Sequence, residues 1–218
     1  MRIYLKTTPN TEPVPFTYQT ALVGALHKWL GENALHDSIS LYSLSWLYHG
    51  KSGKNGLYFP EGSGFFISSP SEDFIGDVIK GILRSPDIRY GLRVTGIDMQ
   101  QTPEFGEQCK FFLQSPVLIK RSLEDKIRFY FPQDEEADLL LTETLRHKLR
   151  RAGQGNLPVQ VRFDRSYPKI KTRLINYKGT ENKATFCPII IEGDPAAIAF
   201  AWDVGVGNST GIGFGALR

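Results

Sequence analysis

The chain has 218 residues, of which 41% are hydrophobic and 22% charged, and its formal net charge is +3. These values are typical of a globular protein with one large domain or two small ones. They exclude a membrane-spanning protein, because the apolar runs are much shorter than the roughly 20 residues that cross a bilayer. The opening residues, MRIYLKTTPN, lack the apolar stretch of a signal peptide, so we expect a soluble cytoplasmic protein with no membrane contact.

The cysteines and histidines do not form a recognisable metal-binding motif. The two cysteines, Cys109 and Cys187, are far apart in the chain, which argues against a disulfide framework or a cysteine zinc site. The four histidines include no pair at the i, i+4 spacing, and no H-E-x-x-H motif is present. We therefore expect no cofactor and no metal, with side chains performing any acid–base chemistry.

The first half of the sequence predicts alternating strands and helices. Leu22, Leu26 and Trp29 fall on one face at helical spacing, which indicates an amphipathic helix. A second helix is predicted after Ser69 as its N-cap, with Pro70 at the first helical position and Glu72 completing a capping box. In chain order we expect a strand at 2–7, a helix at 16–31, a strand at 39–49, a glycine-rich hairpin or loop at 50–64, the helix after Ser69, and a strand near 90–100.

The second half has a similar outline. Its predicted helix at 133–151 begins with acidic residues and ends with basic ones, which complements the helix dipole, and Leu141, Leu145 and Leu149 form its core face. The other predicted elements are strands at 110–119, 126–131, 158–164, 169–178 and 183–192, a short helix at 194–202, and a last strand at 214–217. The whole chain therefore predicts an α+β protein of two tandem ferredoxin-like (RRM-like) folds, in domains 1–104 and 105–218, with a C-terminal glycine-rich loop.

Positive charge is concentrated in one region. Residues 146–183 contain 11 Lys or Arg but only Asp164 and Glu181 as acids, a local net charge of +9, so the remainder of the chain carries −6. Such a stripe is suited to nucleic-acid phosphates, because each neutralised phosphate releases counterions. An ordinary solvated basic face is the alternative.

The last part of the chain is rich in glycine. Five glycines, from Gly205 to Gly215, fall within eleven residues of GVGNSTGIGFGALR. Glycine lets a backbone approach phosphates closely, and successive free N–H groups can form an anion nest. A dinucleotide-binding loop fits poorly, because that motif opens a helix early in a large sheet. The remaining alternative is a tight turn between a helix and an edge strand.

Several segments together resemble a known family. GVGNSTGIGFG looks like the terminal glycine-rich loop of the repeat-associated mysterious protein superfamily, and FFLQSPVLIKR, FYFPQDEEADLLLTETLRHKL and IIIEGDPAAIAFAWDVGVG look like its preceding segments in the same order. LHDS, after the first helix, looks like the catalytic-histidine segment of its CRISPR repeat-RNA endoribonucleases. The resemblance implies tandem ferredoxin-like folds and metal-independent cleavage of CRISPR repeat RNA, leaving 2′,3′-cyclic phosphate and 5′-hydroxyl ends.

The resemblance and the histidine positions suggest a catalytic set. His36 follows the predicted break at the end of the first helix, and an imidazole that titrates near neutrality suits a general acid or base. His49 is the second candidate, and His27 is expected on a solvated helix face, with a substrate contact as the alternative. The family often adds a tyrosine and a lysine, for which we take Tyr42 and Lys51, with Tyr18, Tyr48 and Lys54 as alternatives.

Residues that grip RNA are expected in the basic stripe and the glycine-rich loop. K-I-K-T-R alternation places three basic side chains on one face of a predicted strand. Tyr167 and Tyr177 could stack on unpaired bases. The predicted RNA contacts are Lys148, Arg150, Arg151, Lys169, Lys171, Arg173, Gly205, Gly207, Asn208, Ser209, Gly211 and Gly213.

Two other functions fit the same residues. One is a non-catalytic RNA-binding subunit of a CRISPR effector complex, and the other is a ferredoxin-like scaffold with no nucleic-acid role. The expected partner is CRISPR repeat RNA, while contacts with other effector subunits and a homodimer are left open by the sequence.

Overall fold

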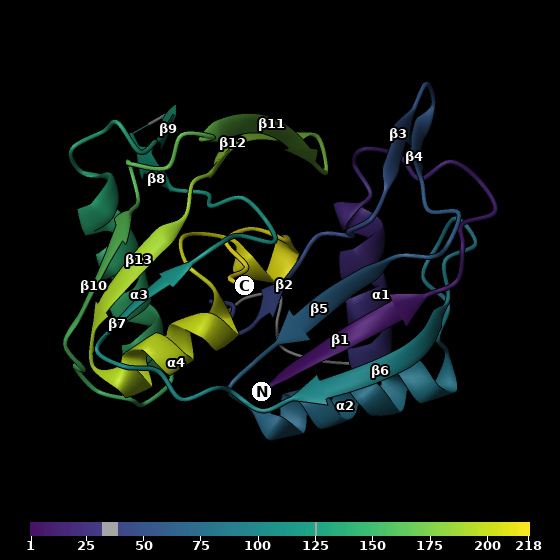
Figure 1. Cartoon of the computed structure of the whole chain (residues 1–218), viewed down its shortest axis with the longest axis horizontal. Coiled ribbons are helices and arrows are strands. Elements are labelled where there is room, and N and C mark those ends of the chain that lie inside the picture. Colours follow the sequence, from purple (N-terminus) through teal and green to yellow (C-terminus); the bar gives the residue numbers. More distant parts are fainter. Residues whose placement is uncertain (32–38, 125) are drawn as a thin grey trace.

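A computed structural model describes residues 1–31, 39–124 and 126–218. The chain has two α+β halves that lie side by side, each built on an antiparallel sheet, and the C-terminal glycine-rich loop lies between them (Figure 1). These are tandem ferredoxin-like folds, as the element order predicts. No helix among the described residues is long and apolar enough to cross a membrane.

The sheet of the first half has the ferredoxin-like strand order. β1 (Arg2–Thr7) lies in the middle and pairs antiparallel with both β5 (Gly64–Ser68) and β6 (Val94–Gln100). β2 (Ser43–Leu44) pairs with β5 at the opposite edge from β6. The strand predicted at 39–49 is thus only two residues long, with an isolated bridge from Tyr48 to Gly64 beyond it.

Two helices pack together on this sheet. α1 (Gln19–Leu30) and α2 (Glu72–Arg84) come very close at Gly81, where an added Cβ would overlap the backbone of Trp29. The predicted N-cap of α2 is wrong by two residues: Ser71 accepts the hydrogen bond from the N–H of Phe74. The Ser69 hydroxyl instead accepts from the N–H of Ser71, the residue that immediately precedes the helix.

The glycine-rich segment predicted as a hairpin or loop forms a short hairpin. β3 (Lys51–Gly53) pairs with β4 (Gly56–Tyr58), and this hairpin projects from the first half (Figure 1). It is an insertion between β2 and β5 that leaves the ferredoxin-like order of the sheet unchanged.

The second half has the same arrangement, except that its fourth strand is reduced to a single β-bridge. β13 (Ile189–Gly193) lies between β10 (Val159–Phe163) and β7 (Gln108–Phe111), antiparallel to both. The strand predicted at 214–217 is a single bridge from Leu217 to Leu113. That bridge occupies the place of the fourth strand, beside β7.

Helices α3 (Ala137–Arg151) and α4 (Pro195–Val204) pack on the core of the second half. The Asp194 side chain caps α4 through the N–H of Ala196, and Pro195 at the first helical position needs no hydrogen-bond partner. The apolar stripe of α3 includes Leu141, Leu145 and Leu149, as its helical spacing predicts.

Two hairpins extend from the second half. β8 (Lys120–Leu123) pairs with β9 (Lys126–Phe129), and β11 (Lys171–Tyr177) pairs with β12 (Thr180–Phe186). The single strand predicted at 183–192 is therefore two strands, β12 and β13. They separate at Cys187 and Pro188, because proline has no N–H to donate to a sheet ladder.

Side chains from both halves meet in the interface. The Arg2 guanidinium lies between two aromatic rings, 3.8 Å from the centre of Phe66 and 3.5 Å from that of Trp202, and donates to the Trp202 carbonyl at 2.8 Å. Each half also has its own buried core. The boundary between residues 104 and 105 stays a prediction.

Candidate functional site

The glycine-rich loop is closed by its own hydrogen bonds. It leaves α4 at Gly205, passes through a short 3-10 turn at Thr210–Ile212 and returns at Gly215. The prediction that this loop presents a nest of free N–H groups is wrong at several positions, where the N–H group donates to a carbonyl oxygen of the chain itself. These donors are the N–H groups of Gly205, Val206, Asn208, Ile212, Gly213 and Gly215.

Glycine is required in this loop because other backbone lies directly against it. Gly215 has φ of +61°, and an added Cβ would overlap the carbonyl oxygen of Val206. A Cβ on Gly207, where φ is +75°, would lie 2.5 Å from the Leu118 carbonyl oxygen. Contacts with the protein's own backbone therefore explain why glycine is needed at these two positions, without any contact with RNA.

Lys148 does not lie on the surface, so its predicted RNA contact is wrong. Its side chain is 2% exposed, and its ammonium donates to the carbonyls of Val204 and Gly205 and to the Thr210 hydroxyl. Lys148 stands three residues after Leu145 and seven after Leu141, so the helical spacing places it on the buried stripe of α3. Burial lowers the pKa of the Lys148 ammonium to about 7.

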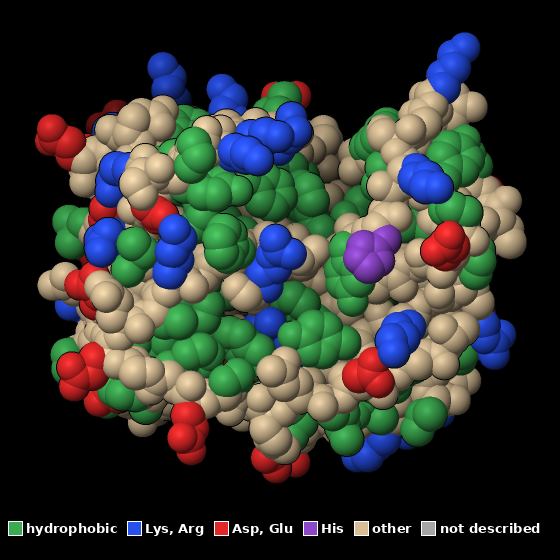
Figure 2. Space-filling view, viewed as in Figure 1, with side chains coloured by type: hydrophobic (Ala, Val, Ile, Leu, Met, Phe, Trp, Pro, Cys, Tyr) green, Lys and Arg blue, Asp and Glu red, His purple; other side chains and the backbone are tan. Residues whose placement is uncertain are grey.

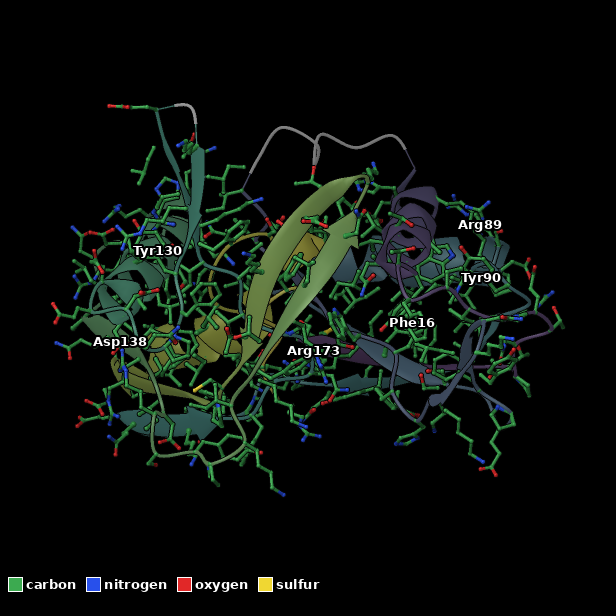
Figure 3. The ribbon with its side chains drawn as sticks, turned by 90° about the horizontal axis from the view of Figure 1, so that it is seen from above. Phe16, Arg89, Tyr90, Tyr130, Asp138 and Arg173 are labelled. Carbon is green, nitrogen blue, oxygen red and sulfur yellow. The ribbon has the colours of Figure 1, made fainter. Side chains whose placement is uncertain are left out.

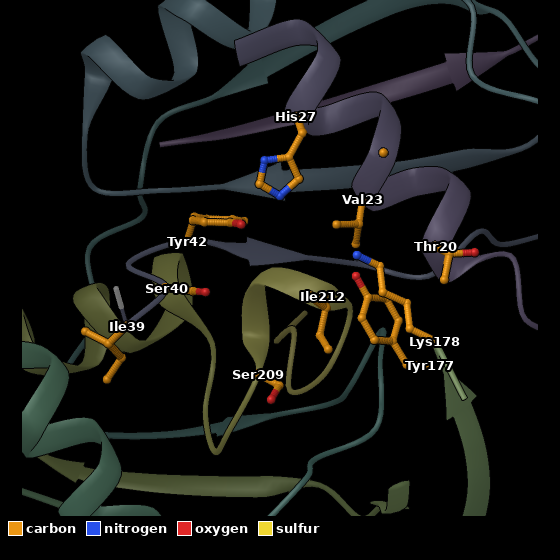
Figure 4. Close-up of a pocket in the computed structure, with 11 residues that line it drawn as sticks. Thr20, Val23, His27, Ile39, Ser40, Tyr42, Tyr177, Lys178, Ser209 and Ile212 are labelled. Atoms are coloured by element: carbon orange, nitrogen blue, oxygen red, sulfur yellow. The ribbon is translucent and has the colours of Figure 1, made fainter. Parts of the chain in front are cut away.

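A cavity of about 610 Å³ opens where the two halves and the loop meet, and we call it the loop cavity. Figure 4 shows four elements around it: α1, the segment from residue 39 to Tyr42, the tip of the β11–β12 hairpin, and the glycine-rich loop. The described residues that line it are Thr20, Val23, Gly24, His27, Ile39, Ser40, Tyr42, Tyr177, Lys178, Ser209 and Ile212.

Tyr42 is held at the wall of the loop cavity by packing. Its ring stacks on Phe74 with a centroid distance of 4.9 Å, and a Cβ on Gly211 would lie 2.7 Å from the Tyr42 hydroxyl. Burial raises the pKa of the Tyr42 hydroxyl, and a hydrogen bond with Ser40 partly opposes that shift. The tyrosine is thus a neutral hydrogen-bonding group at neutral pH.

Of the predicted catalytic set His36, Tyr42 and Lys51, Tyr42 alone is among the described residues that line the loop cavity. His36 lies outside the described residues, although Ile39 and Ser40, which follow it closely in the chain, line the loop cavity. Lys51 lies on the exposed β3–β4 hairpin and is not among the described residues of the cavity wall.

Two residues of the loop cavity stand outside the predicted catalytic and RNA-binding sets. His27, expected on a solvated helix face, points from α1 into the cavity near Tyr42 (Figure 4). Lys178 is at the β11–β12 turn with φ of +50°. Lys178-Gly179 is a recognisable turn signal, but only the folding of the hairpin over the loop brings this lysine to α1.

A second cavity borders the other side of the glycine-rich loop. About 480 Å³ in volume, this helix cavity includes Arg150 and His147 of α3 together with Asn208 of the loop. The Asn208 side chain is fixed, since its Oδ1 accepts from the N–H of Lys120 at 2.9 Å. Arg150 and Arg151 are exposed at the end of α3, where the sequence predicts an RNA contact.

The other part of the basic stripe lies on the β11–β12 hairpin. Lys171 and Arg173 are exposed and share one strand face with the buried Ile175, because side chains alternate along a strand. That face turns toward the molecule, and Figure 3 shows Arg173 between the two halves. Lys183, opposite Leu174 on the partner strand, belongs to the outer face.

Basic and aromatic side chains meet at the base of the hairpin. Lys169 and Lys171 line a cavity of about 240 Å³ with Tyr167, Phe112 and Arg218. The rings of Tyr167 and Phe112 make an edge contact with centroids 6.1 Å apart, and Phe112 is 43% exposed. In Figure 2, lysine and arginine side chains lie along the upper edge of the molecule, beside apolar side chains. An exposed ring next to ammonium groups suits an unpaired base and its phosphate.

Metal ligands are not clustered in the described part of the chain. Within residues 1–31, 39–124 and 126–218, no group of three or more His, Cys, Asp or Glu side chains could hold a metal ion.

Comparisons with known proteins place the chain in a family. A family model described as CRISPR associated protein Cas6, C-terminal, matches residues 100–218, more than half of the chain. A search of curated proteins finds no match. Several solved structures align with the whole chain, and at their low sequence identities this likeness shows the fold.

The first of these structures is described as the characterization of a Cas6-related gene from Pyrococcus furiosus; it has a TM-score of 0.84 at 20% identity, and 97% of it is covered. The second, described as an RAMP protein binding different RNA substrates, has a TM-score of 0.84 at 19% identity with 98% covered. The third, described as CRISPR associated protein Cas6, has a TM-score of 0.82 at 20% identity with 98% covered. The resemblance predicted from the sequence is confirmed: the chain belongs to the Cas6 family of CRISPR-associated proteins, which in general are endoribonucleases that process CRISPR RNA.

Proposed function

We propose that this protein cleaves CRISPR precursor RNA within its repeats, without a metal ion, and leaves 2′,3′-cyclic phosphate and 5′-hydroxyl ends. The observation that carries this function is the loop cavity, where an imidazole, two phenols and an ammonium group surround one space beside the glycine-rich loop. Its volume of about 610 Å³ is that of a small-molecule-sized pocket, enough for a nucleotide and its phosphate.

The reaction requires two proton transfers. A base takes the proton of the ribose 2′-hydroxyl, its oxygen attacks the adjacent phosphorus, and the bond to the 5′ oxygen breaks as an acid protonates that oxygen. Histidine suits either role because its pKa is near neutrality. We assign one role to His36, and His27 offers a second imidazole in the cavity wall.

The negative charge that builds on the phosphorane needs a donor or cation beside it. Tyr42, a protonated phenol whose pKa is raised further by burial, can donate its hydroxyl hydrogen bond without changing charge. Lys178 lines the loop cavity and Lys51 does not, so we assign the stabilising cation to Lys178 in place of Lys51.

Incubating purified protein with a cognate repeat RNA in excess EDTA tests the reaction. We expect one cut per repeat, a 2′,3′-cyclic phosphate on the upstream product, and no loss of rate relative to a magnesium-containing buffer. Cleavage that stops with EDTA contradicts the metal-free mechanism. Tight binding with no cleavage in either buffer identifies a non-catalytic RNA-binding subunit instead.

We further propose that the inner face of the β11–β12 hairpin grips the RNA backbone. Replacing both Lys171 and Arg173 with alanine should weaken binding of repeat RNA and lower the salt slope of the binding constant by about 1 for each lost phosphate contact. The matched control is Lys183→Ala, which removes a charge from the outer face of the same hairpin. Fluorescence anisotropy at several salt concentrations measures both; equal losses in the control and the double variant would show that only net charge matters.

A further inference from the structure

Lys148 is a deeply buried charged group that contacts the glycine-rich loop beside the proposed site. We propose that Lys148 is a positioning residue, which holds the glycine-rich loop against the wall of the loop cavity and thereby sets where Tyr42 stands. Its role in cleavage rests on the proposed function, whereas its hold on the loop does not.

The three N–H groups of the Lys148 ammonium are matched by three oxygen atoms around it. Nζ lies 3.1 Å from the Val204 carbonyl oxygen, 3.3 Å from that of Gly205 and 2.9 Å from the Thr210 hydroxyl. Three N–H groups thus meet three oxygens. The two carbonyls end α4, where the helix dipole favours a cation. The same side chain therefore fixes both the start of the loop and its 3-10 turn.

A hydrogen-bond relay runs from Lys148 to the cavity wall in the other half. The Thr210 hydroxyl accepts from Lys148 and donates to the Tyr42 carbonyl oxygen at 2.9 Å. The next residue, Gly211, lies so close to Tyr42 and Ser40 that an added Cβ would contact both side chains. A shift of the loop at Thr210 consequently displaces the Tyr42 backbone and crowds its hydroxyl.

Packing alone does not account for a lysine at this position. Among the ion pairs of the described residues, no carboxylate partners Lys148, and burying a charged group without one is costly. Methionine has a similar length and would fill the space without that cost, but it cannot donate to the three oxygens. The hydrogen bonds to the loop are what the ammonium adds.

Lys148→Met tests this hold through both cleavage and loop structure. At saturating repeat RNA, and at a temperature where the variant is folded, the single-turnover cleavage rate should fall at least about tenfold, because small misplacements of catalytic groups are expensive. Thr210→Val should act in the same direction, and Thr210→Ser, which keeps the hydroxyl, should restore the rate to within about twofold. Lys80→Met is the matched control, since Lys80 is exposed on α2.

A second readout does not depend on activity. The Trp46 indole donates to the Gly213 carbonyl of the loop at 2.7 Å, whereas the Trp29 indole donates to Ser85 within the first half. In ¹H–¹⁵N spectra, Lys148→Met and Thr210→Val should shift the Trp46 indole signal and leave that of Trp29 in place. Trp46→Phe identifies the signal.

The outcomes separate the two proposals. If the wild-type protein cuts no repeat RNA, the proposed function fails, and the Trp46 signal alone decides whether Lys148 holds the loop. If Lys148→Met does not fold, the Thr210→Val and Thr210→Ser pair gives the answer. A wild-type cleavage rate at saturating RNA in folded Lys148→Met or Thr210→Val overturns the positioning role, and an unshifted Trp46 signal overturns the hold on the loop.

Discussion

A His36→Ala variant should lose about 10² to 10⁴-fold of the cleavage rate on a cognate repeat RNA, the usual contribution of a general acid or base. Its affinity for the RNA should change little, because the surfaces proposed to grip RNA lie on the β11–β12 hairpin and the end of α3. The position of Ile39 and Ser40 in the wall of the loop cavity supports this choice, since His36 precedes Ile39 by three residues and Ser40 by four.

Single-turnover cleavage and fluorescence anisotropy on the same preparations separate the two effects. Full cleavage by His36→Ala would remove His36 from the mechanism. The same measurements on His49→Ala test the other assignment. His49 follows Tyr48, its ring packs on that tyrosine at 4.9 Å, and it is not among the described residues of the loop cavity. We therefore expect the larger loss in His36→Ala.

Gly215→Ala should destabilise the protein by more than about 2 kcal/mol, because two separate costs add at this position. The backbone has φ of +61°, where an L side chain is strained, and the new Cβ would overlap the Val206 carbonyl oxygen. Both backbone groups of Gly215 are hydrogen-bonded, the N–H to the Pro116 carbonyl and the carbonyl to the Val206 N–H, so this segment cannot simply move away.

Gly179→Ala is the matched control for this prediction. Gly179 also has positive φ, +82°, but an added Cβ would meet no atom within 4 Å. Gly179→Ala should lower the free energy of unfolding only by the strain of an L residue at positive φ, about 1 kcal/mol. Urea unfolding of the two variants and the wild type gives the difference. Equal losses would mean that the contact with Val206 relaxes freely.

The regular elements follow from short-range patterns. The apolar spacing of α1 and α3 and the turn residues of the β3–β4 hairpin act within a few positions, so the sequence predicts them well. Predictions were wrong where two neighbouring signals compete. Ser69 and Ser71 can each accept a helix N–H, and Ser71 caps α2. Pro188 interrupts a run that otherwise reads as a single strand.

By itself, the sequence determined the α+β class, the family and the presence of a C-terminal glycine-rich loop, because these depend on residue types in a fixed order. Only the tertiary structure decided what each loop residue touches. The helical spacing places Lys148 on the buried stripe of α3, but its ammonium meets the loop only because the C-terminal ends of α3 and α4 come together in the fold. His27 and Lys178 share a cavity for the same reason, since they are 151 residues apart in the sequence and are brought together by packing around the loop.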